Sequence, residues 1–308
     1  MTITLDKYKV HPTGGFSNHA KEYARLSVRP LASAMGAEIC GVDLSTLDEE
    51  QFAEIADALY HHKMVYFRGQ ELTIDDQESV TLRFGNFGTD AYTTGAEDHP
   101  NVQKVVKEAD SVTTFVFGGS WHTDSPFLER PPAISLLYGV DIPPYGGDTL
   151  WANTELAYDF LSDAMKTLLA PLRVHMSARN VIALLESHKD ESGTMRTGSM
   201  TISPQQEGMI RGSYHPLVRT HPVTGRKALY VDETYAIGIE GMTEPESTAL
   251  INFLCSHITQ PVLTCRLRWE KGTFVMWDNR SCLHHAFNDY DGFRREMYRA
   301  IVEGEVPA

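Results

Sequence analysis

The chain has 308 residues, of which 42% are hydrophobic and 22% are charged, a composition that is ordinary for a soluble globular protein. The formal net charge of −14 disfavours general binding to nucleic acids or to anionic membranes, because both carry negative charge. No run of about 18 apolar residues exists to span a bilayer, and the N-terminus lacks the long apolar run of a signal peptide, so we expect a cytoplasmic protein.

The spacing of apolar residues predicts the elements in chain order. Residues 1–22 are polar and contain Pro12-Thr-Gly-Gly15, which indicates a loose N-terminal arm. Helical spacing predicts helices over 47–59, 74–84, 153–171 (as one helix or two) and 244–258. Short apolar or alternating runs predict strands over 25–31, 64–67, 133–140, 273–277 and 297–302. The expected fold is therefore mixed α/β and mainly β.

The four cysteines contain no Cys-x-x-Cys pair. A zinc ribbon or a thioredoxin-like site is therefore unsupported, and free thiols in a reducing compartment are expected. Cys282 stands two residues before a candidate metal ligand, but its expected role is that of a small buried side chain.

Two motifs far apart in the chain carry candidate metal ligands. His122 and Asp124 stand in Trp-His-Thr-Asp, and His284 stands downstream of Trp-Asp-Asn-Arg. On a β-strand, residues two apart point to the same side, so His122 and Asp124 could chelate one ion from a single strand. Two imidazoles and one carboxylate on one face of a metal leave three adjacent positions open, which is the facial triad of non-haem Fe(II) oxygenases.

Spacing extends this pattern to five residues. Asp124 is followed by 24 residues and Thr149, then by 134 residues and His284, then by 10 residues and Arg295. The flanking words Gly-Gly-Asp-Thr at 146–149 and Trp-Asp-Asn-Arg at 277–280 accompany them. Over roughly residues 24–305, this order resembles the taurine dioxygenase/2,4-D dioxygenase (TauD/TfdA) family of Fe(II)- and 2-oxoglutarate-dependent oxygenases.

The resemblance implies that His122, Asp124 and His284 bind Fe(II), and that 2-oxoglutarate and O2 are cosubstrates converted to succinate and CO2. The C5 carboxylate of 2-oxoglutarate needs a cation and a hydrogen-bond donor. By resemblance, Arg295 supplies the guanidinium, a planar fork that matches a carboxylate, with the Thr149 hydroxyl beside it. An aspartate at position 124 argues against halogenation, because related halogenases carry Ala or Gly there.

His285 competes with His284 for the third ligand position, since adjacent strand residues face opposite ways. The spacing to Trp277 and to Arg295 favours His284. His285 is expected to be a neighbouring packing residue.

The resemblance also implies a small anionic substrate that is hydroxylated at a C–H bond, such as an alkyl sulfonate or sulfate or an aryloxyalkanoate. The hydroxylated product could then collapse into two parts. Arg299 matches the arginine that grips the substrate anion in taurine dioxygenase. Ser125 and Phe127 follow the metal motif and are further candidate pocket residues.

Taurine itself is not the expected substrate. The substrate-binding histidine of taurine dioxygenase aligns with Asp90, whose carboxylate would repel a nearby sulfonate. Gly118 and Thr93 align with the two residues that frame the amine of taurine. Asp90 could instead meet an amine or a hydroxyl group of a different substrate.

The resemblance supplies the architecture, a distorted double-stranded β-helix (jelly roll) with surrounding helices. Residues 23–308 are expected to form a single dioxygenase domain. Residues 179–213 lack a clean period, and both a lid over the metal and an ordinary surface insertion are open. A homodimer or homotetramer is a family-level expectation.

Two other classes of function remain open. A zinc hydrolase could use the same three ligands with a bound hydroxide, although it gives no reason for Thr149 and Arg295 at their spacing. A non-catalytic jelly-roll protein could use the metal pocket as a sensor. A requirement for Fe(II), O2 and 2-oxoglutarate would separate the oxygenase from both.

Overall fold

The computed structural model describes residues 15–89, 91–92, 95–96, 98–111, 118–187 and 206–308. Most of the predicted N-terminal arm lies outside the described residues. The same holds for Asp90, for Thr93 and for residues 188–205 of the predicted lid.

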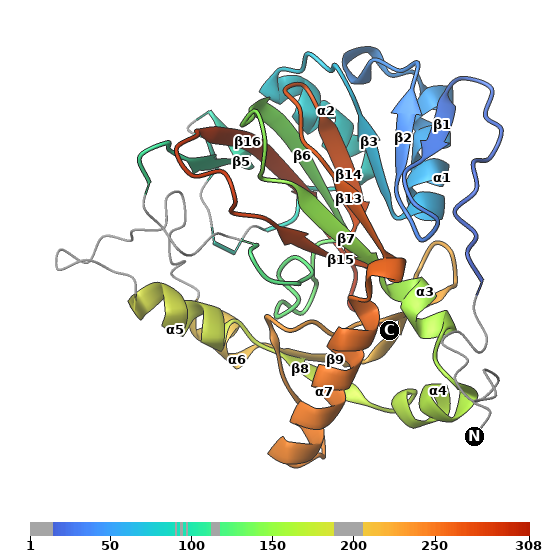
Figure 1. Cartoon of the computed structure of the whole chain (residues 1–308), viewed down its shortest axis with the longest axis vertical. Coiled ribbons are helices and arrows are strands. Elements are labelled where there is room, and N and C mark those ends of the chain that lie inside the picture. The colour runs from blue at the N-terminus through green and yellow to red at the C-terminus, as the bar shows by residue number, and fades with distance from the viewer. Residues whose placement is uncertain (1–14, 90, 93–94, 97, 112–117, 188–205) are drawn as a thin grey trace, which may run out of the picture.

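A large sheet forms one layer of the molecule (Figure 1). In the described part of the chain it has eight strands in the order β1-β2-β3-β14-β6-β16-β5-β4, with β2 and β3 parallel and all other neighbours antiparallel. The strands are β1 (Ser27–Pro30), β2 (Ala37–Cys40), β3 (Met64–Phe67), β4 (Gly95–Ala96), β5 (His99–Lys107), β6 (Ile134–Asp141), β14 (Phe274–Asp278) and β16 (Arg295–Val302).

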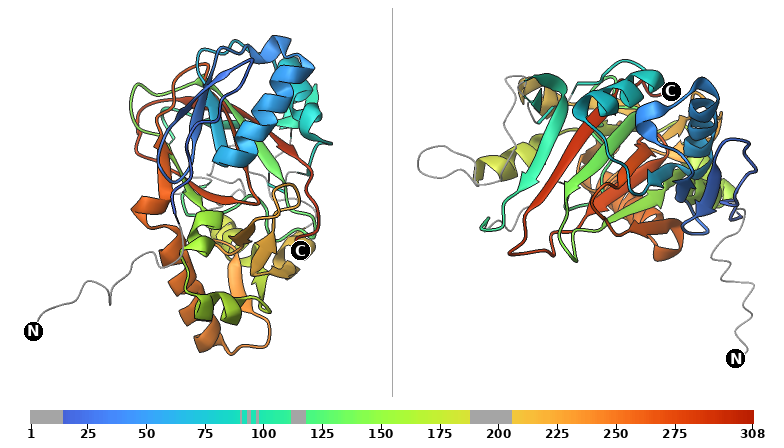
Figure 2. Two further views of the ribbon diagram at one scale, coloured as in Figure 1. Left: turned by 90° about the vertical axis from the view of Figure 1, so that its right-hand side faces the viewer. Right: turned by 90° about the horizontal axis from the view of Figure 1, so that it is seen from above.

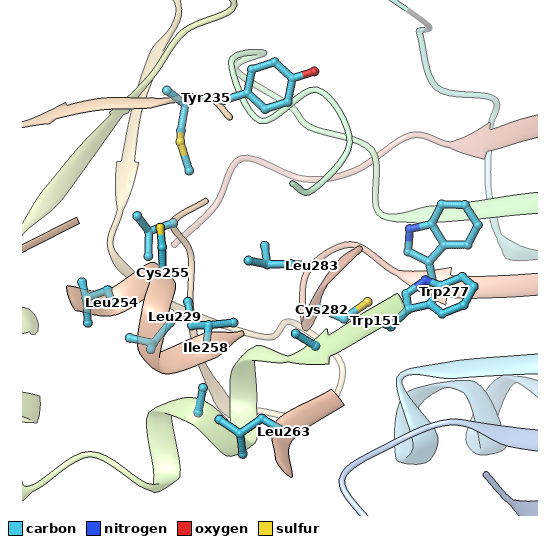
Figure 3. Packing of buried hydrophobic residues seen from close by; sticks show 14 of the residues in the cluster. Trp151, Leu229, Tyr235, Leu254, Cys255, Ile258, Leu263, Trp277, Cys282 and Leu283 are labelled. Atoms are coloured by element: carbon cyan, nitrogen blue, oxygen red, sulfur yellow. The ribbon is translucent and has the colours of Figure 1, made fainter. Parts of the chain in front are cut away.

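A smaller antiparallel sheet faces the large one. It has the order β13-β7-β15 and consists of β13 (Thr264–Leu267), β7 (Thr149–Asn153) and β15 (Cys282–Ala286). Trp151 of β7 packs against Trp277 of β14 with ring centroids 5.9 Å apart (Figure 3). Leu283 and Met297 belong to the same buried apolar cluster, so the core between the two sheets includes β7, β15 and β16.

The large sheet is buried on both faces, and β14 shows how its sequence achieves this. Side chains alternate along a strand. Phe274 and Met276 join the apolar cluster on the outer face, whereas Val275 and Trp277 join the cluster on the inner face. Ser135 of β6 is the register partner of Trp277, and it therefore also lies on the inner face.

Helices α1 (Glu49–His62) and α2 (Ile74–Phe84) cover the outer face of the large sheet. The helix α1 begins at a capping box, in which Asp48 and Gln51 each accept a backbone N–H from the other residue. Buried Ile55 of α1 and Val80 of α2 pack into the outer apolar cluster.

The remaining elements lie mostly at the other end of the molecule, away from α1 and α2 (Figures 1 and 2). A three-stranded sheet has the order β12-β8-β9, and β10 pairs with β11. These elements are α3 (Thr154–Asp159), α4 (Asp163–Leu169), β8 (Arg173–Met176), α5 (Arg179–Ser187), α6 (Gln206–Arg211), β9 (Ser213–Pro216), β10 (Val218–Thr220), β11 (Lys227–Leu229), β12 (Ala236–Ile239) and α7 (Glu244–Ile258), with 3-10 turns η2 (Leu44–Thr46) and η3 (Pro261–Leu263).

All the predicted helices and strands are present, with ends shifted by a few residues, and 153–171 holds two helices, α3 and α4. No period in the sequence predicted β5, although it has nine residues, or the shorter strands β4, β7 to β13 and β15. Among the described residues, no helix combines the length and apolarity that crossing a membrane requires.

Candidate metal centre and cosubstrate pocket

His122, Asp124 and His284 come together between the two sheets. Each offers one ligand atom, and these atoms all lie within 4.8 Å of one another. The His122 N–H donates to the His284 carbonyl at 3.0 Å, and the His284 N–H donates to the His122 carbonyl at 2.8 Å, in an isolated antiparallel bridge. Folding therefore brings the third residue alongside the first two, as the motif spacing predicts.

The expectation that His122 and Asp124 share one β-strand is wrong. Only His122 is bridged, and the chain then bends. Ser125 has a φ of 42°, in the left-handed region that residues other than glycine rarely adopt. This turn, and not strand alternation, directs the carboxylate toward His284, whose Nε2 lies 3.9 Å from Asp124 Oδ1.

Both imidazoles are in the form that a metal needs. The Nδ1–H of His122 donates to the Ser120 carbonyl at 2.7 Å, which leaves Nε2 with its lone pair toward the site. Burial lowers the pKa of His122 and holds that of His284 well below its usual range, so both rings are neutral. Nδ1 of His284 is buried without a hydrogen-bond partner among the described residues.

Asp124 completes a ligand set suited to iron. Burial raises the pKa of its carboxyl group, and nearby His122 opposes that rise. A divalent cation between the three groups would favour the ionised carboxylate. Two neutral imidazoles and one carboxylate match the ligands of non-haem Fe(II), so the residues present fit this metal.

His285 faces away from the three candidate ligands. Its ring lies 5.6 Å from that of Trp121 and 5.2 Å from that of Phe287, and it is about half-buried. The structure therefore brings His284, and not its neighbour, to the candidate metal centre.

Thr149 and Arg295 line the same cavity as the two histidines. Thr149 begins β7 and Arg295 begins β16, so the two residues approach from opposite sheets. Both side chains are buried, and burial lowers the pKa of Arg295 from its usual value. A buried guanidinium beside a hydroxyl group is a suitable receptor for a carboxylate.

Two aromatic residues that the sequence analysis did not identify hold this receptor. The Trp269 indole N–H donates to Thr149 Oγ1 at 2.9 Å. The guanidinium of Arg295 lies 5.7 Å from the Trp269 ring and 5.8 Å from the Tyr290 ring. Trp269 stands eight residues before Trp277, outside every matched word, so spacing alone could not assign it.

The glycines before Thr149 have a steric reason. Gly146 has a φ of +77° and Gly147 a φ of +68°, both in the left-handed region that favours glycine. A Cβ on Gly146 would lie 2.5 Å from the Asp289 carbonyl oxygen. The turn also brings the Gly147 carbonyl within 3.4 Å of Arg295 Nη2, so the Gly-Gly-Asp-Thr word shapes the carboxylate receptor.

Arg299 lies on the inner face of β16, four residues beyond Arg295, and its side chain is buried in the same cavity. Its Nη1 is 3.3 Å from Asp124 Oδ1. Burial lowers the pKa of Arg299 to about 10, so the guanidinium is still charged at neutral pH. The cavity therefore carries two cations, one near the candidate ligands and one near Thr149.

The other predicted substrate residues have different surroundings. Phe127 is buried in an aromatic cluster, 5.7 Å from Tyr92 and 5.2 Å from Tyr235 between ring centroids. Ser125 is buried in the turn after Asp124, where its carbonyl accepts the Leu128 N–H. Asp90 lies outside the described residues.

The segment 232–235 clasps the loop that carries His122 and Asp124. Asp232 accepts the Thr123 N–H at 3.3 Å, and Glu233 accepts the Trp121 N–H at 2.9 Å. The Thr234 hydroxyl donates to the Trp121 carbonyl at 3.0 Å. Such polar residues are ordinary in a loop, and no pattern in the chain connects them with a loop more than a hundred residues earlier.

Comparisons with known proteins identify the family. Residues 27–301 match the family model described as "Taurine catabolism dioxygenase TauD, TfdA family". The chain is 35% identical over 296 residues to an alpha-ketoglutarate-dependent sulfate ester dioxygenase from Pseudomonas putida, which covers 94% of this chain and 92% of the relative. It is 34% identical over 301 residues to an alkylsulfatase from Acinetobacter baylyi, covering 92% and 86%.

A solved structure is also similar. The crystal structure of a taurine dioxygenase from Burkholderia xenovorans aligns with a TM-score of 0.76 at 34% identity, over 92% of this chain and 93% of that chain. The alpha-ketoglutarate dependence in the name of the Pseudomonas relative matches the predicted oxygenase, and matches neither the zinc hydrolase nor the sensor.

Proposed function

The chain belongs to the taurine catabolism dioxygenase TauD, TfdA family and is an Fe(II)- and 2-oxoglutarate-dependent dioxygenase, and we propose that its substrate is a small organic sulfate ester. The two relatives that carry sulfate in their names favour this substrate class. The observation that carries the proposal is the single buried cavity shared by His122, His284, Thr149, Arg295 and Arg299.

We assign the metal to His122, Asp124 and His284. When bound, Fe(II) and 2-oxoglutarate supply oxidation of a C–H bond by O2, with one oxygen atom in the new hydroxyl group and the other in succinate. The chain provides two neutral imidazoles and one carboxylate oxygen to hold the metal. The walls of the cavity, Trp151 and Trp277 among them, keep water away.

We assign the C5 carboxylate of 2-oxoglutarate to Arg295 and Thr149. The guanidinium presents paired N–H groups, and the Thr149 hydroxyl can donate a further hydrogen bond because the Trp269 N–H already occupies one of its acceptor sites. No described acidic side chain is paired with Arg295 by a salt bridge, which leaves its charge for a ligand anion.

We assign the sulfate group of the substrate to Arg299. A charge-assisted contact to a buried guanidinium would orient the carbon that bears the ester oxygen toward the metal. Hydroxylation of that carbon gives an unstable product. Its C–O bond to the sulfate breaks, sulfate leaves with the electron pair, and the new hydroxyl group loses its proton to give an aldehyde.

We propose that Ser125 and Phe127 form part of the substrate wall, with Phe127 acting through its contacts to Tyr92 and Tyr235. Asp90 stays a candidate from the sequence. We further propose that the facing sheets are the two halves of a distorted double-stranded β-helix within a single domain of residues 23–308, and that the segment 179–213 serves as a lid. The cytoplasmic location and the homo-oligomer stay predictions from the sequence.

The first test is an anaerobic titration of the metal-free protein with Fe(II), with and without 2-oxoglutarate, followed by visible absorption. Bidentate 2-oxoglutarate on Fe(II) gives a weak lilac charge-transfer band. We expect the band in the wild-type protein, and its loss at limiting 2-oxoglutarate in Arg295→Ala. Arg294→Ala is the matched control, because Arg294 is the adjacent residue but is exposed and pairs with Glu108 and Asp141.

Turnover then tests the substrate class. A short-chain alkyl sulfate should release sulfate and aldehyde only when Fe(II), O2 and 2-oxoglutarate are all present. Sulfate release without 2-oxoglutarate would instead identify a hydrolase. Release of sulfite from an alkyl sulfonate, or of phenol from an aryloxyacetate, at a higher kcat/KM would move the substrate assignment to that class.

A further inference from the structure

Three buried side chains behind the candidate metal centre form a chain of hydrogen bonds that ends on Asp124. The Trp277 indole Nε1 donates to Asn279 Oδ1 at 2.9 Å, and Asn279 Nδ2 donates to Ser135 Oγ at 2.8 Å. Ser135 Oγ in turn donates to Asp124 Oδ2 at 2.5 Å. All four side chains are buried, so water does not compete for these contacts.

The Trp277 indole fixes the donor-to-acceptor direction of these hydrogen bonds. An indole N–H is a donor only, so the Asn279 atom that faces Trp277 must be the carbonyl oxygen. The Asn279 amide nitrogen therefore faces Ser135 and donates to its oxygen. Ser135 has one hydroxyl proton, and with its oxygen already accepting from Asn279, that proton is directed to Asp124.

The two carboxylate oxygens of Asp124 consequently have different surroundings. Oδ2 accepts the short hydrogen bond from Ser135. Oδ1 faces the site, 3.9 Å from His284 Nε2 and 3.3 Å from Arg299 Nη1. Only Oδ1 is oriented toward the place where the two imidazoles could share an ion.

We infer that Ser135 and Asn279 are positioning residues that make Asp124 a ligand through one oxygen only. The inference rests on the proposed metal site and goes beyond it, because neither residue belongs to the ligand set. A facial triad leaves three adjacent metal positions open. A second carboxylate oxygen on the metal would occupy one of them, and 2-oxoglutarate alone requires two.

The location of both residues fits this role better than a purely structural one. Ser135 is the second residue of β6, between Ile134 and Leu136, which face the outer apolar cluster. A hydroxyl group on the inner face of such a strand costs free energy unless it is hydrogen-bonded. The backbone of Asn279 is itself anchored, since its N–H donates to the Ala133 carbonyl at 2.9 Å and its carbonyl accepts the Thr123 hydroxyl at 2.9 Å.

The test compares Ser135→Ala with the wild-type protein by anaerobic Fe(II) titration and then by 2-oxoglutarate titration of the Fe(II)-loaded protein. Loss of a hydrogen bond to a ligating carboxylate should weaken Fe(II) binding by about 10-fold or more. The 2-oxoglutarate dissociation constant should also rise, and the charge-transfer band should weaken at saturating Fe(II). Ser135→Thr keeps the hydroxyl group and should restore both affinities.

Ser247→Ala is the matched control, because Ser247 is also a buried serine with a hydrogen bond, in this case from the Ile239 N–H at 3.1 Å. It lies on α7, and its loss should leave both affinities unchanged. Unfolding of each variant without metal shows whether the fold is retained. Asn279→Ala should weaken Fe(II) binding in the wild-type background and have a smaller effect in Ser135→Ala, because part of its action passes through the Ser135 hydroxyl. The remainder reflects its direct contact with Asp124, whose N–H lies 3.5 Å from Asn279 Oδ1.

Three outcomes are distinguishable. Wild-type affinities in Ser135→Ala, together with loss of Fe(II) binding in Asp124→Ala, would overturn the positioning role and leave the proposed function intact. Additive effects of the Ser135 and Asn279 variants would overturn the chain of hydrogen bonds. Absence of Fe(II) binding in the wild-type protein would overturn the proposed function and this inference with it.

Discussion

Alternate side chains of the segment Trp277-Asp278-Asn279-Arg280 contact two different regions of the molecule. Trp277 and Asn279 belong to the chain of hydrogen bonds that ends on Asp124. Asp278 and Arg280 face a buried ion cluster, in which Arg280 Nε and Nη2 donate to the two Asp278 oxygens at 2.8 and 2.7 Å. Neighbouring residues therefore alternate between the chain of hydrogen bonds to Asp124 and contacts within the ion cluster.

The two sides differ in how far their charges are balanced. On the cluster side, His221 Nε2 lies 2.9 Å from Asp278 Oδ2, and Arg280 also lies 3.6 Å from Glu305. Burial alone would raise the pKa of Asp278, but the charge and hydrogen bonds of Arg280 hold it well below its usual range. On the metal side, Asp124 accepts a hydrogen bond from Ser135 at Oδ2, and its Oδ1 faces the cavity 3.3 Å from Arg299 Nη1.

Residues that stabilise the fold and residues that serve the metal centre are thus separated by single positions in the sequence. Side chains that satisfy one another stabilise the turn between β14 and β15, which carries His284. The Asp124 carboxylate is held at Oδ2 by Ser135, which leaves Oδ1 directed at the cavity, where it meets Arg299 Nη1 and the candidate metal position. Variants in the ion cluster should therefore change the free energy of unfolding, whereas variants around Asp124 should change the affinity for Fe(II).

The largest expected effect on stability is that of Arg280→Ala. Removal of the guanidinium leaves the fully buried Asp278 carboxylate without its bidentate partner, which should lower the free energy of unfolding by about 3–5 kcal/mol. Urea unfolding of the metal-free protein measures it. Arg294→Ala, which removes ion pairs of a solvent-screened guanidinium, should change stability far less than Arg280→Ala.

Wild-type stability together with loss of Fe(II) binding in Arg280→Ala would contradict the purely structural role of Arg280. That result would assign the ion cluster to the metal centre. We expect instead that the folded fraction of Arg280→Ala binds Fe(II) with an affinity close to that of the wild-type protein.

The next effect is that of Asp124→Ala on metal binding. Loss of the only carboxylate of the triad should weaken Fe(II) binding by about 100-fold or more and abolish 2-oxoglutarate-dependent turnover. Stability of the metal-free protein should fall, because the buried Arg299 guanidinium loses its contact with Asp124, and urea unfolding measures that loss separately from metal binding. Substrate-dependent succinate formation at the wild-type rate would contradict the triad.

The sequence predicts the metal motif well because spacing in the chain constrains it. His122, Asp124, Thr149, His284 and Arg295 were identified by their order, and all five reach one buried region of the structure. The elements with long apolar runs were also predicted, since α1, α7 and β6 each show a clear period.

What the sequence could not supply are contacts that depend on tertiary folding. Trp269 approaches Thr149 through the pairing of β13 with β7, and Ser135 reaches Asp124 because the chain turns at Ser125. No local sequence pattern predicts the positive φ of Ser125. The single strand expected for His122 and Asp124 was wrong for this reason.

A smaller effect concerns the clasp at 232–235. Burial raises the pKa of Asp232 to about 7, although backbone hydrogen bonds from Tyr235, Thr123 and Thr234 oppose that rise. A carboxyl group with a raised pKa in the folded state contributes stability that is fully present below its unfolded pKa and is lost as pH rises through about 7.

The wild-type protein should therefore lose stability relative to Asp232→Asn between pH 5 and pH 8, by on the order of 2 kcal/mol. Unfolding of both proteins in urea without metal, at the two pH values, measures this difference. A constant difference between the two proteins across that range would mean that Asp232 is ionised throughout.

Trp269 should have a modest effect on 2-oxoglutarate binding in the cosubstrate pocket. Trp269→Phe keeps an aromatic ring beside Arg295 but removes the N–H that donates to Thr149 Oγ1. Without that donor the Thr149 hydroxyl is no longer oriented, and loss of about 1 kcal/mol corresponds to roughly 5-fold weaker 2-oxoglutarate binding. Fe(II) affinity without 2-oxoglutarate should not change, since Trp269 is bonded to none of the three ligands. In a Thr149→Ala background the effect of Trp269→Phe should vanish, because the indole then has no hydroxyl group to orient. A loss that persists in that background would show that Trp269 acts through the Arg295 guanidinium instead.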